Sequence, residues 1–255
     1  MTWRPPLSHH LNTWNPSLPP DKFRLFILIY WLIIGIVLVA MWTLLSYSII
    51  PIDTVSLSSS GTTLQALYLA PFCHEIPMHL LTNLLIFFIL GIFLTLITAI
   101  FPKLDKRFYL CPCLTCILFI TVLPFSCSSA LLLVPGFHLV QIVGFSGMVC
   151  AVFGIICVII SFAVWKNFES ARFLIGILLL SAAVYLLLPL AEILNASPAV
   201  PNTAHRIGFL YGIIVTWLIG AALTTGSKKR VYIYLIALLV VIILPLILLG
   251  ITILI

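Results

Sequence analysis

The chain has 255 residues, of which 63% are hydrophobic and only 7% are charged. Soluble globular domains carry about 25% charged residues, so this composition excludes a soluble globule and indicates a polytopic, all-α membrane protein. The chain has twelve Lys and Arg residues and only six Asp and Glu residues. This basic excess does not indicate a nucleic-acid partner, because the basic residues lie in short clusters between apolar runs, where membrane topology explains them.

Residues 1–22 are rich in proline and lack the apolar core and cleavage site of a signal peptide. We interpret them as a flexible cytoplasmic tail. The tail contains His9 and His10, but no further ligands follow at metal-binding spacing. We therefore expect both histidines to be solvated and predict no metal site.

Seven apolar runs are long enough to cross a bilayer. They comprise residues 23–50, 77–101, 108–133, 144–165, 172–194, 204–225 and 231–255, with approximate ends. The first six runs lie within residues 23–225. A basic linker and a seventh transmembrane helix follow over residues 226–255.

Lysine and arginine cluster before the first run and after the second, fourth and sixth runs. The other linkers, residues 51–76, 134–143 and 195–203, contain neither. The positive-inside rule therefore predicts a cytoplasmic N-terminus. Spans two, four and six then run inward, so their first turns meet at the extracytoplasmic side.

Side chains capable of chemistry gather at those first turns. They are Cys73, His74, His79, Asn83, Ser146 and His205. Ionisable groups inside a membrane are costly and usually functional. Two possible bases, His79 and His205, enter at the depth of the serine, so chance clustering is a weak explanation.

Ser146 stands between glycines in GFSGMVCAVFG, residues 144–154, at the start of span four. Gly144 and Gly147 allow a sharp turn and a close approach of the backbone. The first amides of the helix have no intrahelical partner and can hold an oxyanion beside a serine nucleophile. The alternative interpretation is that these small residues only pack helices together.

Helical spacing places small residues on one face of span four and one face of span six. These faces consist of Gly147, Ala151 and Gly154 in span four, and of Ala204, His205, Gly208 and Gly212 in span six. Two such faces allow backbones to approach closely enough for the His205 imidazole to reach the Ser146 hydroxyl.

His79 and Asn83 are spaced i, i+4 and project from one face of span two. Both can donate a hydrogen bond to a developing negative oxygen. His74 precedes Pro77, so we expect it on the turn that enters the span.

Three motifs together resemble the rhomboid family of intramembrane serine proteases. They are HEIPMHLLTN in span two, GFSGMVCAVFG in span four and AHRIGFLYG in span six. The resemblance covers about residues 23–225. It implies a six-helix core that opens to a water-filled cavity on the extracytoplasmic side. The seventh span, after the SKKR linker, resembles the six-plus-one arrangement found in part of the family.

The resemblance implies a dyad without an acid, in which Ser146 is the nucleophile and His205 the general base. It also implies oxyanion donors from Phe145, Ser146, His79 and Asn83. We expect five further residues to support the site: His74, Gly144, Gly147, Gly208 and Gly212.

The implied function is a serine endopeptidase that cleaves single-span transmembrane proteins within the lipid bilayer and needs no cofactor. An alternative is a catalytically inactive rhomboid-like protein that binds membrane clients. Such relatives typically lack the serine or the histidine, and both are present here. A transporter would show related, discontinuous spans in two halves, and the sequence has no such repeat.

The sequence departs from the family pattern at two places, one near the catalytic histidine and one in the first outer loop. Cys150 stands where many rhomboids carry an aromatic residue that stacks on the catalytic histidine, which predicts a looser imidazole. The first outer loop lacks the Trp-Arg pair of the family. Its length still suits a loop that dips into the outer leaflet through Leu64, Leu67, Tyr68 and Phe72.

Two other features receive no functional role. We expect Cys111, Cys113 and Cys116 to pack within the third span rather than bind a metal. Asn195 begins a glycosylation sequon, but Pro198 follows it and the membrane is close.

Overall fold

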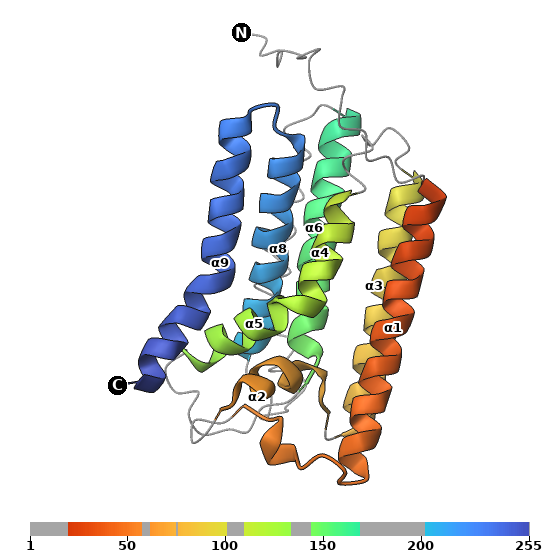
Figure 1. The fold of residues 1–255 in the computed structure, drawn as a ribbon. Coiled ribbons are helices and arrows are strands. Elements are labelled where there is room, and N and C mark those ends of the chain that lie inside the picture. The colour runs from red at the N-terminus through yellow and green to blue at the C-terminus, as the bar shows by residue number, and fades with distance from the viewer. Residues whose placement is uncertain are drawn as a thin grey trace.

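The computed structural model describes residues 20–57, 62–74, 76–100, 110–133, 144–168 and 202–254. Every regular element within these ranges is a helix (Figure 1). The N-terminal tail, the expected fifth span over residues 172–194 and the Asn195 sequon lie outside the described residues.

Five described helices are long and apolar enough to cross a membrane. They are α1 (Pro20–Ser46), α3 (Pro77–Ile100), α6 (Ser146–Phe168), α8 (Asn202–Thr224) and α9 (Lys228–Leu254). These helices agree with five of the seven predicted spans. The complete six-plus-one arrangement stays a prediction.

The third predicted span is broken into two helices. α4 (Leu110–Thr121) and α5 (Leu123–Leu132) meet at Val122 with a bend of 57°. Pro124 lies in the first turn of α5, where its missing N–H is tolerated but a straight continuation of α4 is not. The pair counts as a sixth candidate span only if both parts belong to one crossing.

The bundle places α6 and α8 side by side, with α1 and α3 at one edge and α9 beside α8 at the other (Figure 1). α3, α6 and α8 begin at the same end, next to the short helix α2 (Leu64–Leu69) (Figure 1). The first turns of predicted spans two, four and six therefore do lie at one level.

Glycines bring the backbones of α6 and α8 into contact. A Cβ atom at Gly208 would overlap the carbonyl of Gly147, and one at Gly212 would overlap the carbonyl of Ala151. A Cβ at Gly147 would lie 3.2 Å from the carbonyl oxygen of Ala204. This packing confirms the predicted contact between the two small-residue faces.

The segment between α1 and α3 folds back against the bundle. It contains two 3₁₀ turns, η1 (Ile52–Thr54) and η2 (Ala70–Phe72), which flank α2. Leu67 and Phe72 are each only 3% exposed, whereas Leu64 is 73% exposed. The prediction that this loop dips into the membrane through Leu64, Leu67, Tyr68 and Phe72 is wrong for Leu67 and Phe72, because both pack inside the protein.

Candidate active site

The turn that leads into α6 depends on Gly144. Its φ of +142° lies in a region that residues with a Cβ rarely adopt. A Cβ there would also lie 3.3 Å from Cε1 of His79. The Gly144 amide donates a hydrogen bond of 3.0 Å to the Ala70 carbonyl. These contacts hold the residue two positions before Ser146 between η2 and the first turn of α3.

Phe145 anchors the start of α6 in the core. Its side chain is fully buried. Its ring centroid lies 5.1 Å from that of Phe87 on α3, and 6.0 Å from those of Phe119 on α4 and Phe72 on η2. The residue next to Ser146 is thus fixed by aromatic contacts with three other elements.

His74 joins α3 to the start of α6. The Phe145 amide donates a hydrogen bond of 3.2 Å to Nε2 of His74, and Nδ2 of Asn83 lies 2.9 Å from the same atom. A backbone N–H can only donate, so Nε2 is the unprotonated acceptor and Asn83 also donates to it. His74 and Asn83 are 1% and 5% exposed.

The imidazole of His74 stays neutral. Its burial, and secondly the neighbouring His79, lower the pKa of His74 to about 3. The two ring centroids lie 5.2 Å apart. His74 precedes α3, as expected for the entry turn. Its double hydrogen bond was not anticipated, because no local spacing relates position 74 to position 145.

These hydrogen bonds affect one of the expected oxyanion donors. The Phe145 amide N–H is already bonded to His74. It is therefore not available to an oxyanion while that bond holds. Asn83 also bonds to His74, but its amide group carries two N–H donors.

The first turns of α3, α6 and α8 meet at this point. His79 on α3 lies against Gly144, where a Cβ atom would be 3.3 Å from its Cε1. Ala204, which precedes His205, packs against Gly147, which follows Ser146. Ser146 and His205 are both partly buried. The predicted hydrogen bond between their side chains stays a prediction.

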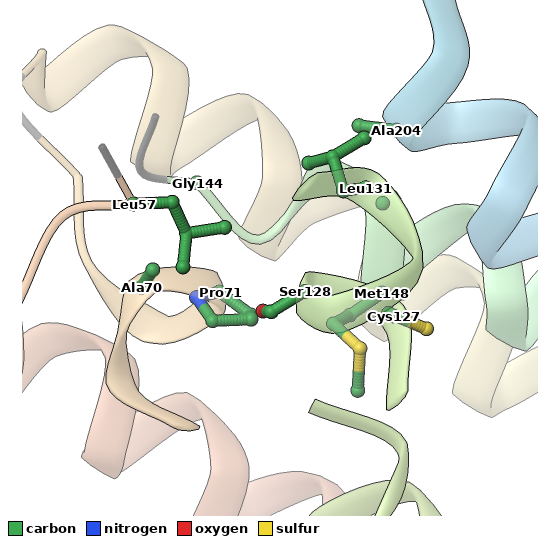
Figure 2. A pocket seen from close by; sticks show the side chains of 10 residues that line it. Leu57, Ala70, Pro71, Cys127, Ser128, Leu131, Gly144, Met148 and Ala204 are labelled. Atoms are coloured by element: carbon green, nitrogen blue, oxygen red, sulfur yellow. The ribbon is translucent and has the colours of Figure 1, made fainter. Parts of the chain in front are cut away.

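A small hollow lies beside this meeting point (Figure 2). Its lining comes from the loop (Leu57, Ala70, Pro71), from α5 (Cys127, Ser128, Leu131) and from the starts of α6 and α8. It leaves about 40 Å³ for the centres of water-sized molecules. The hollow is therefore large enough to admit water.

The cysteines of CPCLTC lie in the interior of the bundle. Cys111, Cys113 and Cys116 are buried, and the thiol of Cys111 donates to the Thr216 carbonyl at 3.6 Å. This contact packs α4 against α8. Among the described residues, no group of three or more His, Cys, Asp or Glu is arranged to hold a metal ion.

A family profile described as Rhomboid domain matches residues 62–222, which is more than half of the chain. No curated protein and no solved structure matches the chain. Together with the apolar helices, the match identifies an integral membrane protein.

Proposed function

The chain belongs to the rhomboid family, and on this basis we propose that it is an intramembrane serine endopeptidase that cleaves transmembrane substrates. One observation carries the proposal within the family. The first turns of α6 and α8 touch through Gly147 and Ala204, the chain neighbours of Ser146 and His205. Nucleophilic catalysis needs the hydroxyl and its base within hydrogen-bond reach.

In the proposed reaction, Oγ of Ser146 attacks the carbonyl carbon of the scissile peptide while His205 accepts the hydroxyl proton. The C–N bond then breaks, and His205 returns the proton to the leaving amine. An acyl-enzyme ester remains on Ser146. A water attacks this ester, His205 takes the water's proton, and the serine hydroxyl is regenerated as the acid product leaves.

The oxyanion needs donors that are already in position. We propose the Ser146 amide, which has no partner within the first turn of its helix, and the side chains of His79 and Asn83. The Phe145 amide is left out, because it donates to His74. His74 is instead assigned to hold Asn83 and the start of α6 in place.

We also propose that the N-terminus is cytoplasmic and that the site opens to the extracytoplasmic side. Lys228, Lys229 and Arg230 begin α9 at the end of the bundle opposite to the start of α6 (Figure 1). Basic residues favour the cytoplasmic face. The substrates would then be single-span proteins cut near their extracytoplasmic ends.

The test uses purified protein in liposomes with a panel of single-span substrates and a fluorophosphonate probe. Wild type should cleave a substrate and take up the probe at Ser146. Ser146→Ala and His205→Ala should each lose cleavage by about 10³-fold or more, and the double variant should lose little more, because the two residues act as one unit.

Ser161→Ala is the matched control. Ser161 lies on the same helix and donates to the Cys157 carbonyl within that helix. This variant should cleave and label like wild type. A folded wild type that neither cleaves nor labels would overturn the proposal in favour of a client-binding rhomboid-like protein.

A further inference from the structure

The helix α9 contains a proline where a continuous helix needs a hydrogen-bond donor. Pro245 lies inside α9. A residue at this position would normally donate its N–H to the carbonyl four residues earlier, which belongs to Val241. Proline has no N–H, and its ring crowds that carbonyl. Pro245 therefore leaves the Val241 carbonyl without its intrahelical donor.

Two other helices supply donors at this point. The hydroxyl of Tyr211 on α8 donates to the Val241 carbonyl at 3.3 Å. Oγ of Ser126 on α5 donates to the next carbonyl, that of Ile242, at 3.0 Å, and the Val122 carbonyl just before α5 is a more distant acceptor at 3.3 Å. No water replaces a lost partner in the hydrocarbon of a bilayer. The two hydroxyls therefore link α9 to α5 and α8 one turn before the proline.

Beyond the proline, α9 reaches the end of the bundle that holds the site. Most large apolar side chains of α9 are exposed, but Leu249 is 6% exposed. Leu249 clusters with Leu57, Leu67, Ala70 and Leu131. Three of these partners, Leu57, Ala70 and Leu131, also line the hollow beside Gly144 (Figure 2). Leu249, near the end of α9, thus packs behind residues that line the hollow.

We propose that α9 is part of the catalytic unit and that Tyr211 and Ser126 are positioning residues, which act through the Val241 and Ile242 carbonyls, one turn before Pro245. Tyr211 follows His205 by six residues on the same helix, about 9 Å along its axis. Ser126 is on the helix that supplies Cys127 and Ser128 to the hollow. Docking of α9 therefore fixes both the helix that carries His205 and one wall of the hollow.

The catalytic part of this inference rests on the proposed function, whereas docking does not. Docking is tested by hydrogen exchange of the full-length protein in detergent. Tyr211→Phe and Ser126→Ala should increase amide exchange over residues 241–250. Tyr232→Phe is the matched control, because Tyr232 lies on α9 and is 66% exposed. It should leave exchange unchanged.

Positioning is tested by kinetics at a temperature where all variants are folded. Tyr211→Phe should lower kcat roughly threefold or more, with KM changed less than about twofold. Pro245→Ala restores an intrahelical donor for the Val241 carbonyl. In that background, Tyr211→Phe should have almost no further effect, a coupling that general destabilisation would not produce.

Unchanged exchange over residues 241–250 in both hydroxyl variants would overturn the inference, whether or not the protein is an active protease. Increased exchange with unchanged kcat would overturn the positioning role. A wild type that is inactive would overturn the proposed function and, with it, the positioning role. If its variants still show the expected exchange differences, the docking of α9 is supported.

Discussion

Gly208 of α8 lies directly against the backbone carbonyl of Gly147 of α6, with no room for a methyl group between them. Ser146 precedes Gly147 by one residue, and His205 precedes Gly208 by three. The distance over which the proposed proton transfer takes place is thus set by a contact between two backbones.

Gly208→Ala should push α6 and α8 apart. Overpacking of this kind costs about 1–3 kcal/mol, so the unfolding midpoint in detergent should fall. Fluorophosphonate labelling of Ser146 should fall as well, because the base moves away from the nucleophile. Thermal unfolding and labelling rates check both effects.

Gly250→Ala is the control for that variant. Gly250 also lies in a helix, but a Cβ there would meet nothing within 4 Å. Alanine is the better helix former by up to about 1 kcal/mol, so this variant should be neutral or slightly more stable. Equal losses in the two variants would contradict the backbone contact as the cause.

Gly144→Ala should destabilise the turn before Ser146 by about 1–3 kcal/mol, because alanine is strained at a φ of +142°. The added methyl group would also crowd His79 at 3.3 Å. Combining Gly144→Ala with His79→Ala removes the crowding and leaves the strain. Denaturant unfolding should be measured for wild type, the two single variants and the double variant. We expect most of the stability lost in Gly144→Ala to remain lost in the double variant. Full recovery of stability would attribute the effect to the contact with His79 alone.

His74→Ala should leave the Phe145 N–H and an Asn83 N–H buried without their acceptor. Each unsatisfied donor costs about 1–3 kcal/mol, and both labelling and stability should decline. His74→Gln provides an amide oxygen near the position of Nε2 and should recover a measurable part of both. If glutamine behaved like alanine in unfolding and labelling experiments, the shared acceptor would not be what His74 contributes.

Stability should decrease as the pH falls from about 6.5 towards 3. The pKa of His74 is lowered from 6.5 to about 3 by burial and by His79. In this range the unfolded chain binds a proton at His74 that the folded protein does not bind, so acidification favours unfolding. Well above pH 6.5 both states are neutral and His74 contributes no slope.

The measurement is the free energy of unfolding between pH 7 and pH 4 for wild type and His74→Gln. Glutamine does not titrate, so the variant should show a shallower decline. Identical slopes would mean that the acid sensitivity comes from other groups.

The sequence by itself determined the class of the protein and the level of its candidate site. Apolar run length is a local property, and it located the helices that became α1, α3, α6, α8 and α9. Helical periodicity placed the small residues of α6 on one face and those of α8 on one face, because spacing along a helix fixes which side chains share a face. The order of the three motifs indicated the family.

Only the tertiary structure decided which donor each acceptor receives. His74 and Phe145 are 71 residues apart in sequence, and Tyr211 and Val241 are 30 apart. No periodicity relates such positions. Residue spacing therefore predicted neither the hydrogen bond from the Phe145 amide to His74 nor the docking of α9 at Pro245. Hydropathy assigned Leu67 and Phe72 to the membrane, and only the packing of the loop against the bundle gave them protein partners, because an apolar side chain gains from leaving water in either environment.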